Sequence, residues 1–203
     1  TGNPAIDALQ QISQLPPPSQ VSQWLEDWEI TSGKRRLVLV TAHRRENFGK
    51  PIEDICTALS LLAQHYGDGL QIVYPVHLNP NIQGPVHKQL DGIPGIKLLP
   101  PIDYLPLVHL MKASTIVLTD SGGIQEEATG LGKPTLVLRE KTERPEGVTA
   151  GVLKLVRKKK KKIVTESTRL LDDSTAYAAM AHTENPFGDG HAAEKIVKGI
   201  LEY

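Results

Sequence analysis

The sequence predicts an α/β protein built on a doubly wound parallel sheet, and three observations lead to this expectation. Apolar, β-rich runs alternate with helical patterns in units of about 20 to 30 residues, which is typical of parallel strands joined by crossover helices. The run 36–41 is apolar after its first residue and ends at a polar loop, as expected of a strand buried on both faces. A second such run, 114–119, stops at a glycine turn that opens a helical pattern.

The elements are predicted in order from these patterns. Two short helices, around 6–12 and 21–28, come before the first strand. Strands are expected at 36–41, 70–76, 96–99, 115–119, 135–138 and 152–156. Helices are expected at 51–66, 81–90, 103–112, 126–131, 163–172, 175–181 and 192–201. The segment 51–66 illustrates the basis, because its apolar residues recur at helical spacing and Pro51 stands in its first turn.

Composition and charge exclude several classes of protein. The 23 basic and 23 acidic residues cancel, so the chain lacks the basic footprint of a nucleic-acid-binding protein. Cys56 is the only cysteine, which excludes an intrachain disulfide and a cysteine-based metal cluster. No apolar run approaches the roughly 20 residues of a membrane helix, and the start lacks a signal-peptide pattern. We expect a cytoplasmic protein without a membrane partner, and the start at Thr1 suggests a fragment.

The turn at 120–123 is the first candidate site. Ser121 is followed by Gly122 and Gly123, which let a ligand approach the backbone, and the free N–H groups of a first helical turn favour an anion. In the alternative interpretation, Asp120 or Ser121 only caps the helix. Ligands of doubly wound sheets bind beyond the carboxyl ends of the strands, and most unusual polar residues of this chain fall in those loops. This agreement favours binding.

The loop after the first strand is the second candidate. His43, Arg44 and Arg45 stand at the carboxyl end of 36–41, where two arginines can bind phosphate and a histidine supplies a titrating group. The alternative is a surface loop in which Glu46 pairs with one of the arginines. Taken alone, this loop favours the surface-loop interpretation.

The segment 139–146 forms another charged loop at the same edge. It brings Lys141, Arg144 and glutamates there, although a solvated charged loop would have the same composition. His77 lies alone in a loop after the strand 70–76, a setting in which histidine is usually structural. Each of these segments is ambiguous by itself.

Together, however, the motifs resemble a known family. They read HRREN (43–47), YPVHLNPN (74–81), DYLP (103–106), TDSGGIQEEA (119–128), GKP (132–134) and TERPE (142–146). The tail NPFGDGHAAEKI (185–196) is similar to the family's NPYGDG segment, and TGNPAIDAL at the start is similar to the stretch that joins its two domains. The chain resembles the non-hydrolysing UDP-N-acetylglucosamine 2-epimerases over nearly its whole length.

The resemblance implies a domain organisation. Members have two Rossmann-like domains in a glycosyltransferase-B-like arrangement, with the substrate between them, and this chain corresponds to the C-terminal half. Residues 1–34 are then expected to be interdomain linker and helices, and 35–172 the Rossmann-like UDP-binding domain. Residues 173–203 are expected to be helices that pack back towards an N-terminal domain. A homodimer is expected of the full-length protein.

The resemblance also implies a reaction. Such enzymes interconvert UDP-GlcNAc and UDP-ManNAc through anti elimination of UDP, which gives 2-acetamidoglucal, and re-addition with inversion at C2. They need neither an external cofactor nor a metal, and they serve cell-surface polysaccharide biosynthesis. The leaving diphosphate carries full charge, so its stabilisation is a large part of the catalysis.

Roles are carried over residue by residue for the UDP site. Ser121 with the amides of Gly122 and Gly123 is expected to grip the diphosphate, assisted by Arg144. Glu127 is expected to accept hydrogen bonds from the ribose hydroxyls. Glu126 lies about 100° round the same helix, so both carboxylates cannot point at one ligand.

Further residues follow from the same motifs. His43 is expected near the diphosphate and sugar, where it stabilises or protonates the departing phosphate oxygen, and Ile102 and Leu107 are expected in the UDP pocket. In bacterial members the HRREN and PVHLNP loops help form a neighbouring site for an activating second UDP-GlcNAc. That assigns a possible allosteric or supporting role to Arg44, Arg45, Glu46 and His77.

Three features depart from the family. Leu107 stands where an aromatic ring often covers the uracil, so base affinity is expected to be lower. The basic run 157–162 stands before a helix that lacks a cap, and we interpret it as a solvated helix start rather than an anionic-surface patch. The catalytic carboxylates belong to the N-terminal domain, so this chain alone is expected to bind UDP weakly and not to epimerise.

Two other functions remain open at the level of sequence. A glycosyltransferase of similar architecture would use the same glutamate and glycine-rich grip on UDP, although HRREN and TERPE together argue against it. A non-catalytic nucleotide-sugar-binding fragment is the other alternative. Sugar transfer to an acceptor would favour the first, and failure to restore activity with an N-terminal half would favour the second.

Overall fold

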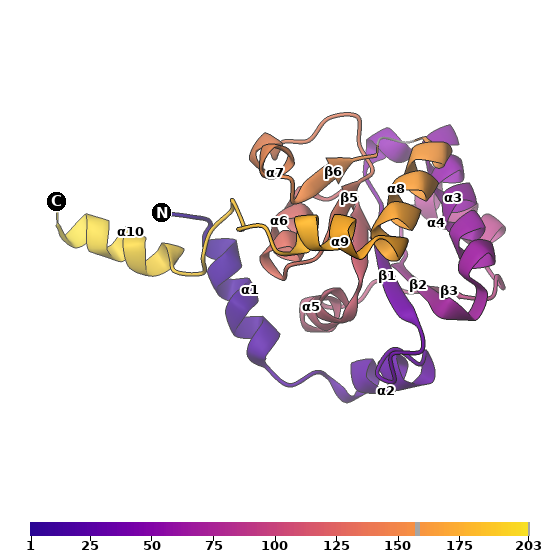
Figure 1. Ribbon diagram of the computed structural model, residues 1–203, viewed down its shortest axis with the longest axis horizontal. Helices are drawn as coiled ribbons and strands as arrows, with labels where there is room; N and C mark the ends of the chain where they lie inside the picture. Colours follow the sequence, from indigo (N-terminus) through magenta and orange to yellow (C-terminus); the bar gives the residue numbers. More distant parts are fainter. Residues whose placement is uncertain (157–158, 203) are drawn as a thin grey trace.

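A six-stranded parallel sheet forms the centre of the protein (Figure 1). The structure, a computed structural model, describes residues 1–156 and 159–202. The strands are β1 (Arg36–Thr41), β2 (Leu70–Pro75), β3 (Ile96–Leu99), β4 (Ile116–Thr119), β5 (Thr135–Val137) and β6 (Leu153–Leu155). They lie in the order β3-β2-β1-β4-β5-β6, every neighbouring pair parallel, which confirms the predicted doubly wound Rossmann-like class.

The helices occupy nearly all the predicted segments. They are α1 (Pro4–Gln14), α2 (Ser19–Asp27), α3 (Lys50–Tyr66), α4 (Pro80–Leu90), α5 (Tyr104–Ala113), α6 (Gly122–Gly130), α7 (Pro145–Ala150), α8 (Lys160–Asp172), α9 (Ser174–Ala181) and α10 (Ala192–Leu201). Two short 3-10 turns, η1 (Arg45–Asn47) and η2 (Gly67–Gly69), complete the set.

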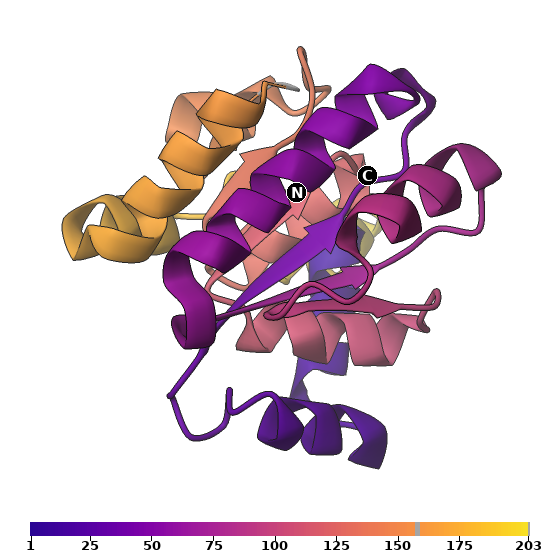
Figure 2. The same cartoon turned by 90° about the vertical axis from the view of Figure 1, so that its right-hand side faces the viewer.

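The sheet is buried on both faces, which explains its apolar strands. Val38 and Val40 of β1 pack on one face, in a cluster with residues of α3, α4 and α8. Leu37 and Leu39 alternate with them and pack on the other face, with residues of α2, α5 and α6. Figures 1 and 2 show the two helical layers on either side of the sheet.

Three differences from the sequence prediction concern the candidate motifs and the basic run. Helix α6 begins at Gly122 rather than near 126, so both glycines belong to its first turn. The predicted loop 139–146 contains the start of α7, because Pro145 opens a helical turn there. Helix α8 begins at Lys160, inside the basic run, and its N-cap Lys159 makes no side-chain capping bond, as expected. Arg157 and Lys158 lie outside the described residues.

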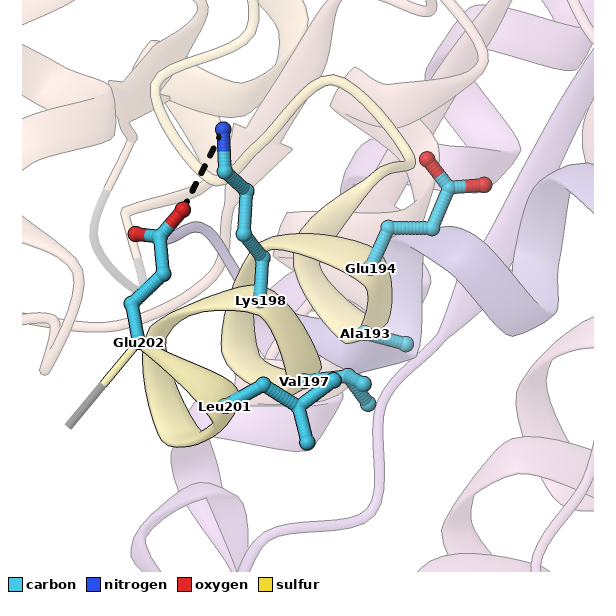
Figure 3. Close-up of a pocket in the computed structure, with 6 residues that line it drawn as sticks. All are labelled: Ala193, Glu194, Val197, Lys198, Leu201 and Glu202. Carbon is cyan, nitrogen blue, oxygen red and sulfur yellow. Dashed lines mark ion pairs between the residues drawn. The ribbon is translucent and has the colours of Figure 1, made fainter.

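The two terminal segments meet on one side of the domain. The carboxylate of Asp7 in α1 accepts hydrogen bonds from the amides of Ala192 and Ala193, at 3.1 and 2.8 Å, and so caps α10. From that anchor, α10 extends past α1 and away from the sheet (Figure 1). Figure 3 shows Val197 and Leu201 on its uncovered side, and they are 55% and 81% exposed. Within the described part of the chain, no helix is long and apolar enough to span a bilayer.

Candidate functional site

The site lies where β1 and β4 meet at the centre of the sheet. The connection after β1 runs through α3 on one face, and the connection after β4 runs through α6 on the other. This is the topological switch point, at which open parallel sheets leave a crevice for a ligand. A hydrogen bond of 2.7 Å from Thr41 Oγ1 to Thr119 Oγ1 joins the two strand ends. The loop at 42–49 and the turn at 120–121 therefore face each other across one crevice.

Asp120 organises the loop after β1. Its carboxylate is completely buried, and Oδ2 accepts hydrogen bonds from the amides of His43 and Arg44, both at 2.8 Å. The side-chain amide of Asn47 donates a third, at 2.7 Å. The interpretation of Asp120 as a helix cap is therefore wrong, because its oxygens are turned towards the β1 loop instead of α6.

The first turn of α6 is left open. Ser121 stands at the N-cap, but its hydroxyl makes no capping bond, and its own amide donates to Thr119 Oγ1 at 3.0 Å. In the described part of the chain, the amides of Gly122, Gly123 and Ile124 have no acceptor. Three N–H groups at the positive end of a helix dipole, with a free hydroxyl beside them, make an anion site.

Two guanidinium groups reach this turn. A Cβ placed on Gly122 would lie 3.8 Å from Nη2 of Arg44 and 3.8 Å from Nη2 of Arg144. The structure thus brings Arg44, which the sequence assigned to a neighbouring site, as near to the turn as Arg144. Arg45 is exposed in η1. The convergence of two permanent cations with free amides suits a ligand carrying more than one negative charge.

The loop after β5 is organised by a buried arginine. Arg139 is 9% exposed, and its Nε donates to Glu46 Oε1 at 2.8 Å. Its Nη1 and Nη2 donate to the two oxygens of Glu143, at 2.6 and 2.9 Å. The hydrogen bonds from Arg139 lower the pKa of Glu143 to about 2, so this carboxylate stays charged. Glu46 thus forms an ion pair with Arg139 of another loop.

Glu127 lies in α6 and contacts Tyr104 at the start of α5. Its Oε1 accepts a hydrogen bond of 3.0 Å from the hydroxyl of Tyr104, and Oε2 is buried without a hydrogen-bond partner in the described part of the chain. Burial raises the pKa of Glu127, and the nearby Glu126 adds to the effect. Burial and Glu127 raise the pKa of Tyr104 to about 12, so its hydroxyl remains a donor. An unsatisfied carboxylate oxygen here is ready to accept from a ligand hydroxyl.

Glu126 points elsewhere, as the helical spacing predicted. Its Oε1 pairs with Nε of Arg144, and its Oε2 accepts from the side-chain amide of Asn3 at 2.6 Å. The two neighbouring carboxylates therefore serve different partners, with Glu127 alone turned towards Tyr104.

His43 sits between a buried carboxylate and a second histidine. Its Nδ1 lies 3.6 Å from Asp120 Oδ1, and its ring stacks on that of His77 with centroids 5.3 Å apart. Burial lowers the pKa of His43 below its usual 6.5, while Asp120 acts in the opposite direction. Burial therefore favours the neutral imidazole in the free site. His77 is not the isolated loop residue that the sequence indicated, and its Nδ1 accepts from the amide of Asn79 at 3.1 Å.

Comparisons with known proteins agree with this geometry. Residues 1–201 match a family model described as UDP-N-acetylglucosamine 2-epimerase. The chain belongs to the UDP-N-acetylglucosamine 2-epimerase family. The protein of that name from Escherichia coli K12 is 47% identical over 202 residues, which cover 98% of this chain and 54% of the relative. The chain thus spans about half the length of the curated relatives it matches.

Two solved structures extend the comparison to the fold. The UDP-GlcNAc 2-epimerase from Neisseria meningitidis, bound to UDP-GlcNAc, has 41% identity and a TM-score of 0.87 over all of this chain and 55% of its own. The co-structure of S. aureus MnaA with UDP has 41% identity and a TM-score of 0.89, over all of this chain and 53% of its own. The expected correspondence to half of a two-domain epimerase agrees with these coverages.

In this epimerase-family chain, the expected site residues divide into two groups. The turn residues, Arg144 and His43 gather at the switch point, joined by Arg44. Ile102 and Leu107 are half-buried against the apolar cluster under α5. Asp120, Arg139 and Tyr104 were missed as site residues. Asp120 and Tyr104 carried a signal, since they lie inside the TDSGGIQEEA and DYLP motifs that the resemblance already used, whereas Arg139 lies outside the quoted motifs.

In residues 1–156 and 159–202, no three His, Cys, Asp or Glu side chains gather where they would hold a metal ion.

Proposed function

We propose that this chain is the UDP-binding half of an enzyme that interconverts UDP-GlcNAc and UDP-ManNAc. The observation that carries the proposal is the convergence, at one switch point, of unpaired α6 amides with the guanidinium ends of Arg44 and Arg144. A diphosphate suits the two guanidinium groups and the amides, and the carboxylate of Glu143 beside them is paired with Arg139. Glu127, with its unpartnered Oε2, suits a ribose hydroxyl at the next position along the nucleotide. The relatives named or solved as UDP-GlcNAc 2-epimerases support the same substrate.

The proposed chemistry is an elimination of UDP. It is assisted by the cradle formed by the unpaired α6 amides with Arg44 and Arg144. A base removes the proton from C2 of the sugar, the C1–O bond breaks with its electron pair passing to the phosphate oxygen, and a C1–C2 double bond forms. Re-addition of UDP and delivery of a proton to the opposite face of C2 complete the epimerisation. The cradle stabilises the anionic leaving group, and the base is expected from the other domain of the full-length protein.

His43 has a defined part in this scheme. Because Nδ1 faces Asp120, the ring can present Nε2 to the departing phosphate oxygen. The charge of a bound diphosphate favours protonation of the imidazole, opposing the burial that lowers the pKa of the free site. Asp120 stabilises the imidazolium that results. His43 would therefore gain its proton when the leaving group is in place.

The remaining assignments follow the same proposal. We place the full-length protein in the cytoplasm as a homodimer that supplies cell-surface polysaccharide synthesis. Residues 1–34 act as linker, and 173–203 as helices directed towards the other domain, while 35–172 bind UDP. The uncovered apolar side chains of α10 support a partner surface for that helix.

Calorimetric titration tests the site. UDP is expected to bind this chain. A variant with both Ser121→Ala and Arg144→Ala is expected to lose at least tenfold in UDP affinity. Uridine, which has no phosphate, serves as the control ligand. Equal affinity of the variant for UDP would remove the proposed diphosphate site. Addition of an N-terminal half should then restore conversion of UDP-GlcNAc to UDP-ManNAc, whereas sugar transfer to an acceptor would indicate a glycosyltransferase.

The pair of Tyr104 and Glu127 predicts a pH effect on binding. A protonated Glu127 is a poorer acceptor for the ribose, so UDP affinity should fall as the pH drops through the raised pKa of this carboxyl. The hydrogen bond from Tyr104 opposes that rise, so Tyr104→Phe should raise the pKa of Glu127 further and move the loss of affinity to higher pH. Titrations from pH 7 to 4.5 compare the variant with the wild type, which cancels the titration of UDP itself. Superimposable pH profiles would contradict the role of Glu127.

A further inference from the structure

Glu126 is a carboxylate of the TDSGGIQEEA motif without an assigned part in ligand binding, yet it is only 7% exposed. A buried carboxylate is retained only with good partners, because an unpaired one is costly. Its two oxygens are divided between Arg144 and Asn3. One partner belongs to the proposed diphosphate site and the other to the first residues of the linker segment.

The arginine is held so that one end stays available. Nε of Arg144 pairs with Glu126, and Nη1 donates to the carbonyl oxygen of Glu143 at 3.1 Å. Nη2 has no hydrogen-bond partner in the described part of the chain, and it is the atom that lies 3.8 Å from a Cβ placed on Gly122. Glu126 thus binds the Nε side of the guanidinium and leaves Nη2 at the α6 turn.

The backbone of the arginine is tied to the same helix. The amide of Arg144 donates to Thr142 Oγ1 at 3.0 Å, and that hydroxyl donates to Gln125 Oε1 at 2.6 Å. Two consecutive residues of α6 therefore anchor Arg144, Gln125 through Thr142 and Glu126 through the guanidinium. These contacts tie the arginine to the helix that carries the unpaired amides.

The other oxygen of Glu126 reaches the linker. Asn3 is the N-cap of α1, where its Oδ1 accepts from the amide of Ala5 at 3.0 Å. Its own amide donates to the carbonyl of Phe187 at 2.8 Å, and Asp7 one turn later caps α10. Asn3 therefore contacts segments from both ends of the domain, and it also donates to Glu126, which holds Arg144.

We propose that Glu126 is a positioning residue that sets Arg144 against the diphosphate and makes its placement depend on the linker through Asn3. The inference rests on the proposed function and deepens it, since it concerns regulation of that site. A shift of the 1–3 segment relative to α6 would take one partner from Glu126 and loosen the arginine. Diphosphate affinity would then follow the position of the linker.

Two variants test the two halves of the proposal. Glu126→Gln keeps the size of the side chain and removes its charge, so UDP affinity should fall about fivefold to tenfold, while uridine affinity should not change. Asn3→Ser keeps an N-cap acceptor for α1 but is too short to reach Glu126, so UDP affinity should fall about twofold to threefold. Increased UDP affinity in Glu126→Gln would mean that Glu126 withholds the arginine, and would overturn the proposal.

The chain offers a matched control for the buried charge. Glu166 of α8 is also largely buried, and it bridges Lys154 of β6 at 2.7 Å and Arg169 of α8 at 3.1 Å. Glu166→Gln should cost stability in thermal unfolding without changing UDP affinity. An equal loss of UDP affinity in this control would attribute the effect to general loosening and overturn the proposal.

A second readout does not need the nucleotide. The Nε–H resonance of Arg144 in ¹⁵N spectra of the free chain should move in Glu126→Gln and, by a smaller amount, in Asn3→Ser. An unchanged resonance in both variants overturns the inference. Failure of the wild type to bind UDP would count against the proposed function instead, so the two failures are distinguishable.

Discussion

Replacing Asp120 by alanine is expected to lower the free energy of unfolding by about 3 kcal/mol or more. The substitution removes one oxygen that serves three donors, the amides of His43 and Arg44 and the side chain of the fully buried Asn47. Buried donors without an acceptor carry the full desolvation penalty, roughly 1–3 kcal/mol each. Urea unfolding followed by circular dichroism measures the change.

Two controls sharpen this prediction. Asp103→Ala removes an exposed carboxylate that makes no side-chain capping bond to α5, and it should cost less than about 1 kcal/mol. Asp120→Asn keeps an oxygen for the three donors and loses only the charge, so its cost should lie between the two. A loss in Asp120→Ala no larger than in Asp103→Ala would show that the β1 loop does not depend on this carboxylate.

Replacing Gly122 by alanine should lower UDP affinity at least tenfold and leave the protein folded. The new methyl would lie 3.7 Å from Glu143 Oε2 and 3.8 Å from the ends of Arg44 and Arg144, which are ordinary van der Waals distances. Alanine is also favoured over glycine in a helix, by up to about 1 kcal/mol. The methyl, however, takes the space between the two guanidinium groups that a phosphate would need. Calorimetry with UDP and a thermal melt measure both effects.

Gly199 supplies the comparison for this substitution. It lies inside α10 with nothing within 4 Å of an added Cβ, so Gly199→Ala should gain similar helix stability. Its UDP affinity should equal that of the wild type, since α10 is remote from the switch point. Wild-type affinity in Gly122→Ala would mean that the diphosphate does not approach the α6 turn.

Periodicity predicted the fold because it reports a property of each segment alone. A strand such as β1, buried on both faces, must be apolar along its length, and α3 must present one apolar stripe, so both were visible locally. The ends were less certain. Glycine has a low helix propensity, so Gly122 and Gly123 favoured a later helix start. In the structure, α6 begins at Gly122, which is buried in the packed domain.

The sequence predicted those features of the site that follow from the spacing of residues along one element. The divergence of Glu126 and Glu127 followed from helical geometry, and the structure confirms it through their different partners. Asp120 gave no such signal. The same sequence is compatible with Asp120 as a helix cap and with Asp120 as an acceptor for another loop. The two roles differ only in the direction of the carboxylate.

What the sequence by itself determined is therefore the doubly wound parallel fold, the turn at Ser121 and, through its motifs, the family. The tertiary structure alone decided that β1 and β4 are neighbours, and hence that Arg44 meets Arg144 at Gly122. It also decided that Arg139, from the loop after β5, pairs with Glu46. The physical reason is that local patterns specify which face of an element is buried, whereas contacts between loops depend on the spatial order of the strands in the sheet.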